Sequence, residues 1–340
     1  MAALKDRIEP LLQEWSPVMR EAFLKAFRTL RNRAEMSRLV AQIKAGDVEG
    51  AVAAIGLDPL VFRPVAAALE RTFEEGGIDA TAGIRTVRGP LGIRVTPMFD
   101  PRAPAAEAWV RQHSDDLIKQ ITEDQRTLIR AAMAPLWSGD DPMLTGQTPQ
   151  KIALDLVGRI SAVTGNREGG VLGLTSQQAQ WARNYAVELG DAQAGVVPDA
   201  GALTRTFRDR RFDRTVRRAI KEGTPLPADA RRAMVANYRN KALIYRAEMV
   251  SKHEALTALH QSQLEAWDQA IARGATTADG VRRYWVTMGD ERVRETHAEI
   301  PGMNAEGRGL REPFQTPEGE FMNPPIAPNC RCRVRIRVLE

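Results

Sequence analysis

The sequence contains very little cysteine. Only two of its 340 residues are cysteines, Cys330 and Cys332, and both lie close to the C-terminus. One pair of cysteines cannot build a disulfide scaffold, so the fold must depend on a hydrophobic core. Two residues apart on a strand, they would be separated by about 6.6 Å, the strained limit for a disulfide. We therefore expect both thiols to be reduced and not bonded to each other.

The sequence also lacks a long apolar run. It has no uncharged stretch of about 18 apolar residues, so we expect no membrane-spanning helix and no membrane partner. The N-terminal segment MAALKDRIEPLLQEW carries charges where a signal peptide needs an apolar segment, so no secretion signal is evident. These absences predict a chain that folds in a reducing cytoplasm.

What the sequence does contain is typical of a globular protein. Hydrophobic residues make up 43% of the chain and charged residues 27%, and the length gives room for about two domains. The net charge of +5 is compatible with an anionic partner, although many soluble proteins carry a similar excess.

Periodicity and proline content divide the chain into four parts. We predict an N-terminal helical region over 1–77, a linker over 78–105, a helical domain with a long basic helix pair over 106–275, and a small domain over 276–340. The linker is rich in proline, and one short strand is expected at its GIRV segment. The predicted fold class is a mainly α N-terminal helical region with a long helix, followed by a small α+β C-terminal domain.

Two helical patterns stand out near the N-terminus. One helical face is predicted for four apolar residues within MREAFLKAFRTLRNRAEMSRLVAQI, namely Phe23, Phe27, Leu30 and Leu39. A shorter helix within PLVFRPVAAALERTF is predicted to end at Gly76 and Gly77, because glycine commonly terminates helices.

Capping patterns mark two helices in the middle of the chain. Thr148 followed by Pro149 predicts one helix start. Thr175 or Ser176 predicts another, for a helix that ends at Gly190. Between them, GGVLG could suggest a phosphate loop. It lacks the lysine and the strand–helix context that such a loop needs, so we interpret it as a plain turn.

A basic segment precedes a long helix. Residues 205–221 carry eight basic and two acidic side chains and are predicted to form one helix. The next helix is predicted from about Ala228 to about Arg273, a length of roughly 70 Å. Its apolar residues follow a 3-4 repeat broken only by Lys252, which favours packing in a bundle or between subunits over a small enzyme core. That repeat consists of Val235, Tyr238, Ala242, Tyr245, Met249, Leu256 and Leu259.

The C-terminal segment PNCRCRVRIRVLE alternates strictly. Side chains on a strand point alternately to opposite faces. One face would hold Cys330, Cys332, Val334, Ile336 and Val338, and the other would hold Arg331, Arg333, Arg335 and Arg337. The pattern predicts a strand with one buried apolar face and one guanidinium face.

Two interpretations of the cysteines stay open. Free cysteines behave as small buried hydrophobes, and then no cofactor is expected. Alternatively, Cys330 and Cys332 supply two thiolates to zinc if the chain bends at Asn329, with His297 as a third ligand. A fourth ligand is not obvious from the sequence, and its candidates are Asp290, His253 and His260.

The C-terminal motifs resemble a known family. YWVTMGDERVRETHAEIPG followed by PPIAPNCRCRVRI, over roughly residues 282–338, resembles the phage Mu F-like head morphogenesis domain. The preceding helix is similar to that family's R-x-E helix, at Arg246 and Glu248, and departs from it at Ser251 and Lys252. The matching motif positions are Trp285, Asp290, Arg292, Val293, Arg294, His297, Gly302, Asn329, Cys330, Arg331 and Cys332.

The resemblance implies a bacteriophage minor head protein without enzymatic activity. Such a protein would lie in the virion, inside the head or at the portal vertex, after assembly in the host cytoplasm. Its partners would be the portal, the major capsid or a scaffold protein, together with packaged DNA, and the chain could form a homo-oligomer. The function implied is head morphogenesis, with a role in DNA packaging or delivery.

Two further hypotheses concern the charged residues. Asp290, Arg294 and His297 could serve a nucleic-acid-processing enzyme or a toxin-like module, although the carboxylates here have no strong metal-binding spacing. The simpler interpretation is an ion-pair network in which Asp290 fixes Arg292 or Arg294 at a turn. Nonspecific contact with DNA or with a partner would use Arg208, Arg210, Arg211, Arg214, Arg217, Arg218, Arg331, Arg333, Arg335 and Arg337.

Overall fold

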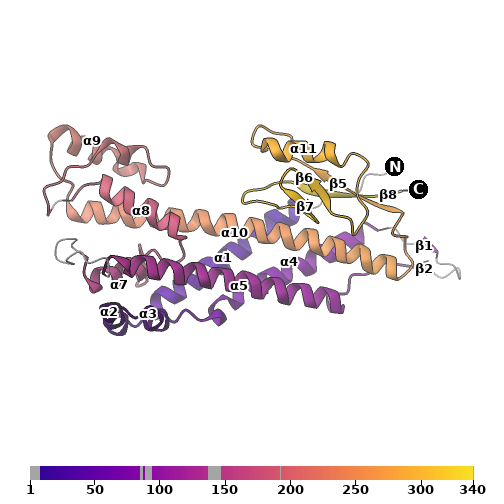
Figure 1. The fold of residues 1–340 in the computed structure, drawn as a ribbon, viewed down its shortest axis with the longest axis horizontal. Helices are drawn as coiled ribbons and strands as arrows, with labels where there is room; N and C mark the ends of the chain where they lie inside the picture. The colour runs from indigo at the N-terminus through magenta and orange to yellow at the C-terminus, as the bar shows by residue number, and fades with distance from the viewer. Residues whose placement is uncertain (1–7, 85–86, 89–93, 137–146, 192, 340) are drawn as a thin grey trace. The chain divides into compact units, whose positions relative to one another are not determined.

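The computed structural model describes residues 8–84, 87–88, 94–136, 147–191 and 193–339. Long helices dominate, and short strands with one further helix form the C-terminal part, which confirms the predicted fold class (Figure 1). Spatial contacts divide the chain into two compact units. Unit 1 comprises the residues up to Ala22, Pro64–Asp116, and the residues from Glu248 onward, and unit 2 comprises Phe23–Arg63 and Leu117–Ala247. These units do not test the predicted division into four consecutive parts, which stays a prediction.

Three long helices contribute residues to both units. They are α1 (Ile8–Arg33), α5 (Pro104–Met133) and α10 (Ala228–Ala272). The 45 residues of α10 confirm the long helix predicted from the 3-4 repeat. Five residues of that repeat are buried, while Met249 is half-buried and Tyr245 is exposed.

Unit 2 consists mainly of short helices. They are α2 (Met36–Ala45), α3 (Val48–Ile55), α7 (Pro149–Val157), α8 (Ser176–Glu188) and α9 (Asp213–Glu222), with 3-10 turns at Pro59–Phe62, Ala134–Leu136, Ala200–Leu203 and Arg210–Phe212. Strands β3 (Arg159–Ile160) and β4 (Arg167–Glu168) form a small antiparallel pair. The caps predicted for α7 and α8 are confirmed, because the side chains of Thr148 and Thr175 each accept a backbone N–H in the first helical turn.

The aromatic core of unit 2 is built around α1. Phe27 packs against Phe23 and Phe62, with ring centroids 4.9 and 5.4 Å apart. The predicted face is buried, but the prediction of one continuous helix was wrong, because α1 ends at Arg33 and α2 begins at Met36. The backbone N–H of Glu35 donates to the carbonyl of Ala54 at 2.9 Å, so the break is fixed by the end of α3. No local sequence pattern encodes that contact.

The C-terminal part of unit 1 is a small α+β arrangement. Strand β5 (Val281–Val286) pairs antiparallel with β8 (Arg333–Val338), placing Trp285 opposite Val334. Strands β6 (Phe314–Thr316) and β7 (Gly319–Phe321) form a second antiparallel pair, and α11 (Glu295–Met303) lies beside them (Figure 1). A hydrophobic core joins these elements to the last turns of α10 through Leu264 and Trp267.

The other elements of unit 1 are α4 and a two-stranded pair. Helix α4 runs from Arg63 to Ala82, and all of its residues after Arg63 belong to unit 1. Strands β1 (Val87–Arg88) and β2 (Arg94–Val95) are antiparallel. The GIRV segment is described only at Arg94 and Val95, which form β2, and its first two residues lie outside the described residues.

Helix α4 corrects the predicted helix end at Gly76 and Gly77. The helix continues through both residues to Ala82. A Cβ atom on Gly76 would lie 2.4 Å from Ser262 Oγ, and one on Gly77 would lie 2.3 Å from the Phe99 ring. Both glycines therefore allow close packing inside unit 1 and do not end the helix.

In the part of the chain that the structure describes, no single helix has the length and apolar content to cross a membrane. The bent pair Val48–Ile55 and Pro59–Ala82 reaches these limits only when its two helices are taken together.

Candidate functional site

The residues proposed as metal ligands meet in unit 1. Cys330 Sγ lies 3.6 Å and Cys332 Sγ 3.5 Å from His297 Nδ1. All three side chains are buried, and their candidate ligand atoms lie within 4.8 Å of one another. Among the described residues, these three side chains are the potential metal ligands that come together here. No further His, Cys, Asp or Glu of the described residues belongs to the cluster as a fourth ligand.

The local chain path explains how His297 reaches the cysteines. The structure places this residue in the first turn of α11, where its backbone N–H donates to the carbonyl of Arg294 at 3.0 Å. The extended path ends after β5, and Gly289 adopts a left-handed φ of 68° that extended chain does not allow. The helix then directs the imidazole toward the core.

The C-terminal segment 328–340, here called the tail, largely follows its predicted alternation. Strand β8 begins at Arg333, and the side chains from Cys330 to Ile336 alternate between buried and half-buried. Val338, which was predicted on the buried face, is instead exposed at the end of the strand. Asn329 has a φ of 60°, so the chain bends immediately before the first cysteine, where the zinc interpretation requires a bend. The two thiols are not joined in a disulfide.

The two thiols differ in acidity. A hydrogen bond from the Cys332 thiol lowers the pKa of Cys330 to about 5, while the reciprocal interaction and burial raise the pKa of Cys332. Nearby His297 also favours the Cys330 thiolate.

A small pocket opens beside the cluster. Its volume is about 20 Å³, which is room for one water molecule. Its lining residues are Met288, Arg292, Val293, Arg294, His297, Asn329, Cys330, Arg331 and Cys332. Arg294 is held at the rim, because its guanidinium donates to the carbonyl of Pro328 at 2.5 Å.

Asp290 corrects one predicted contact. Its carboxylate pairs with the guanidinium of Arg331 at 2.8 and 2.6 Å, and not with the side chain of Arg292 or Arg294. It also caps its own turn by accepting the backbone N–H of Arg292 at 3.2 Å. The hydrogen bond from Arg331 lowers the pKa of Asp290. Both carboxylate oxygens are thus engaged, and Asp290 is not among the residues that line the pocket.

His260 does not complete the metal site. Its Nδ1 donates to the carbonyl of Pro324 at 2.8 Å, and its Nε2 accepts the backbone N–H of Val334 at 3.2 Å. Both ring nitrogens are therefore used to join α10 to the tail. His253 is half-buried on α10 and does not belong to the cluster.

Arg283 is a buried residue that the sequence interpretation missed. It lies on the inward face of β5 between Val281 and Trp285, and it is fully buried. Its guanidinium donates to the carbonyls of Gly309 (3.1 Å), Met322 (2.6 Å) and Glu312, and to Asn323 Oδ1 (3.0 Å). The period-2 pattern of VRRYWV could have indicated an inward arginine.

The basic segment is organised differently from the predicted helix. The helix α9 begins only at Asp213, so the predicted helix over 205–221 was too long. The helix does not continue before Asp209. The carboxylate of Asp209 accepts the backbone N–H of Arg211 and so caps the short turn at Arg210–Phe212 that precedes α9.

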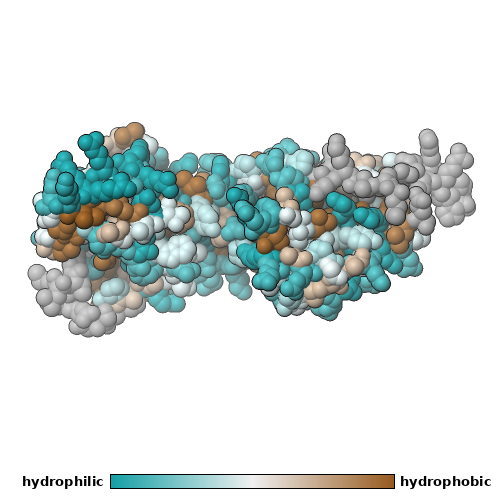
Figure 2. Space-filling model, turned by 90° about the horizontal axis from the view of Figure 1, so that it is seen from above, coloured by the Kyte–Doolittle hydropathy of each residue, from teal (hydrophilic) through white to brown (hydrophobic). Residues whose placement is uncertain are grey.

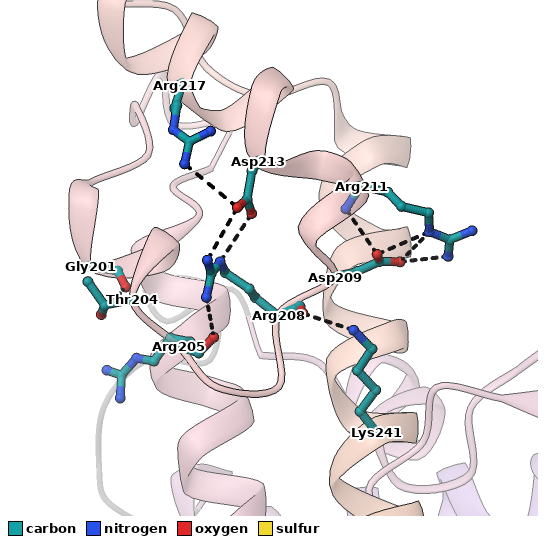
Figure 3. A network of polar contacts seen from close by, with 9 residues as sticks. All are labelled: Gly201, Thr204, Arg205, Arg208, Asp209, Arg211, Asp213, Arg217 and Lys241. Carbon is teal, nitrogen blue, oxygen red and sulfur yellow. Dashed lines mark hydrogen bonds and ion pairs between the residues drawn. The ribbon is translucent and has the colours of Figure 1, made fainter.

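Several cations of this segment are already paired (Figure 3). Arg208 donates to both carboxylate oxygens of Asp213 at 3.1 and 3.3 Å. Arg211 pairs with Asp209 at 2.6 Å. Outside the drawn set, Glu188 holds the Arg205 guanidinium. These contacts fold the segment and neutralise part of its charge.

The remaining cations form an exposed surface, here called the α9 surface. It consists of Arg210, Arg214, Arg217, Arg218 and Lys221. Arg217 and Arg218 make only long ion pairs, at 3.8 Å to Asp213 and 3.5 Å to Glu222. Such exposed pairs contribute little energy. On the side where Figure 1 places α9, Figure 2 shows hydrophilic surface next to a hydrophobic band.

The arginine face of the tail is largely engaged within unit 1. Arg331 pairs with Asp290, and Arg333 pairs with Glu9 of α1. The guanidinium of Arg337 lies over the Tyr284 ring at 4.9 Å. Arg335 is half-buried. The role of these residues in DNA contact stays a prediction, which the pairing of Arg331 and Arg333 does not favour.

The GGVLG segment is a turn held by buried arginines. Arg31 donates to the carbonyls of Gly170 (3.0 Å) and Leu172 (2.5 Å), and Arg246 donates to that of Gly173 (3.0 Å). A phosphate loop presents backbone N–H groups to its ligand, whereas this turn presents carbonyls to cations. The interpretation as a turn is confirmed.

The geometry therefore defines a small α+β domain that carries a His-Cys-Cys cluster in unit 1, and an exposed basic helix in unit 2. Residues 210–335 match the family model described as Phage Mu protein F like protein. The match contains α9, α10 and the whole His-Cys-Cys cluster, so this region is similar to the phage Mu F-like family. A search of curated proteins and a search of solved structures gave no significant match.

Proposed function

We propose that the chain is a minor head protein of a bacteriophage or prophage-like particle. The observation that carries this proposal is the family match over 210–335, which includes the tail and the cluster that gave the resemblance. The role proposed is structural and not catalytic. In support, Asp290 is engaged by Arg331, so His297 has no free carboxylate from that residue to act as its base partner.

We further propose that the α9 surface contacts packaged DNA. A protein inside a filled head has DNA as its neighbour, and exposed arginines displace counterions from phosphates without reading sequence. Arg210, Arg214, Arg217 and Arg218 are exposed, whereas Arg208 is committed to Asp213. Binding should therefore be weak, indifferent to sequence and strongly dependent on salt.

The protein partners proposed are the portal, the major capsid or a scaffold protein, with self-association through α10 as a further contact. In support, α10 exposes the apolar side chain of Ile244 within unit 2. These contacts would hold the protein in the head or at the portal vertex.

Two measurements test the proposal. Mass spectrometry of purified heads should detect the protein in intact particles, and its absence from both heads and empty proheads would contradict the assignment. For DNA contact, changing Arg210, Arg214, Arg217 and Arg218 to Gln should lower the slope of log affinity against log salt by about 0.9 for each phosphate that the protein no longer neutralises.

The matched control is Arg211→Gln, since Asp209 already binds that guanidinium. It should change the salt slope much less than any one of the α9 substitutions. Equal slopes for the control and the α9 variants would show that the α9 surface does not meet DNA. Cleavage of DNA on addition of magnesium would favour the enzyme hypothesis instead.

A further inference from the structure

The His-Cys-Cys cluster has a geometry that a hydrogen-bonded thiol pair does not require. Both sulfur atoms lie at nearly the same distance from one nitrogen, His297 Nδ1, at 3.6 and 3.5 Å. One imidazole lone pair accepts one hydrogen well, so at most one of these contacts can be a good thiol hydrogen bond. The hydrogen bond between the two thiols keeps the sulfur atoms side by side, but it does not require both of them to lie equally far from Nδ1.

A tetrahedral metal ion accounts for these nearly equal distances. Zinc binds cysteine sulfur at about 2.3 Å and histidine nitrogen at about 2.0–2.1 Å. At a tetrahedral angle these bonds place sulfur and nitrogen about 3.5–3.6 Å apart. The two measured distances agree with that value.

We propose that His297 Nδ1, Cys330 Sγ and Cys332 Sγ bind one thiophilic divalent cation, of which zinc is the expected example. Binding releases the protons that the thiols carry to solvent and involves no oxidation or reduction. The proposal concerns unit 1 alone and does not depend on a role in phage heads.

The surroundings fit three protein ligands and one open position. The adjacent pocket has a volume of about 20 Å³, which is enough for one water molecule as the fourth ligand. The other ring nitrogen, His297 Nε2, is buried and lies 3.9 Å from Glu318 Oε1. A carboxylate near that nitrogen is the kind of group that orients a metal-binding histidine.

The site would join three separate parts of the C-terminal fold. Cys330 and Cys332 follow the bend at Asn329, and His297 belongs to α11. A metal ion would fix the bend, the start of β8 and the helix in one arrangement. This role suits a segment with only short strands.

The first test is elemental analysis of the full chain produced in zinc-supplemented medium. We expect one zinc per chain, and loss of metal in Cys330→Ser, Cys332→Ser and His297→Ala. The matched control, His253→Ala, should retain zinc because His253 lies outside the cluster. Retention of metal in all three cluster variants would overturn the proposal.

The second test uses only the unchanged protein, so that it does not depend on variants that could fail to fold. After removal of metal by a chelator, Co²⁺ should produce thiolate-to-cobalt charge-transfer absorption, and both thiols should become less reactive toward a thiol reagent. Absence of zinc together with absence of this absorption would refute the site. Addition of cyanide should change the cobalt spectrum, and an unchanged spectrum would contradict the open fourth position.

Discussion

Arg283 offers the most demanding test of how unit 1 is stabilised. Its guanidinium is fully buried and bonds to the three carbonyls and the one amide oxygen described above. It also lies over the Phe314 ring, with 4.8 Å from the guanidinium carbon to the ring centroid. Burial lowers the pKa of Arg283 to about 10, so the side chain remains charged at neutral pH. The perturbation is Arg283→Met, which keeps similar bulk and removes every donor.

The expected loss of stability follows from the carbonyl groups that lose their hydrogen-bond donor. A hydrogen bond typically contributes about 0.5–1.5 kcal/mol to stability. Three carbonyls, of Gly309, Glu312 and Met322, lose a donor in this variant, and water replaces part of what is lost because Glu312 and Met322 are exposed residues. At about 1 kcal/mol for each carbonyl the expected loss is about 3 kcal/mol, increased by the loss of packing against Phe314. A loss of about 3 kcal/mol corresponds to a roughly 100-fold increase in the equilibrium constant for local opening of the structure.

Hydrogen exchange measured by mass spectrometry provides a local assay. The amides of β5 and β8, over Val281–Val286 and Arg333–Val338, should exchange about 100-fold faster in Arg283→Met, whereas amides of unit 2 should not change. The matched control is Arg282→Met on the same strand. Arg282 is half-buried and donates only to the nearby carbonyls of Asp279 and Val281. Equal exchange in both variants would refute the assigned role of Arg283.

Two further predictions concern other sites. Gly77→Ala should destabilise the protein by about 1–3 kcal/mol in urea unfolding, because its Cβ would meet the Phe99 ring, while Gly302→Ala, which has open space, should be tolerated. The hydrogen bond from Arg211 lowers the pKa of Asp209 to about 2, below an unfolded value of about 3.9, so its stabilising contribution is present above pH 4 and lost as the pH falls toward 2. Asp209→Asn should therefore flatten the dependence of unfolding free energy on pH in that window, and an unchanged acid slope would contradict this.

The predictions that held rest on local information. Strand alternation in the tail depends only on the order of residues, and the structure buries Cys330, Cys332, Val334 and Ile336 as that order requires. Helix starts at Thr148 and Thr175 held for the same reason, since a cap and its N–H partner lie within one turn. The bend at Asn329 was a condition of the zinc interpretation, and the structure meets that condition.

The predictions that failed depended on distant partners. A glycine can end a helix, or it can allow close packing within one. For Gly77 the second applies because the Phe99 ring packs against it, and Phe99 is distant in the sequence. Asp290 was assigned to nearby Arg292 or Arg294, but its partner Arg331 lies 41 positions away in the chain. The helix predicted over 205–221 was too long because carboxylates at Glu188, Asp209 and Asp213 hold its first arginines in another arrangement.

This difference bears on how the basic residues should be interpreted. Charge summed along a sequence treats all cations alike, yet Arg208 and Arg333 are each bound to a carboxylate within their own unit, while Arg214 and Arg218 are exposed on α9. A phosphate would have to displace a closely bound carboxylate to reach the first pair, whereas Arg218 makes only an exposed ion pair with Glu222 at 3.5 Å. Contact with an anionic partner should therefore concentrate on α9. The tail has a different part in the molecule, since its arginine face holds unit 1 together and its cysteine face meets His297.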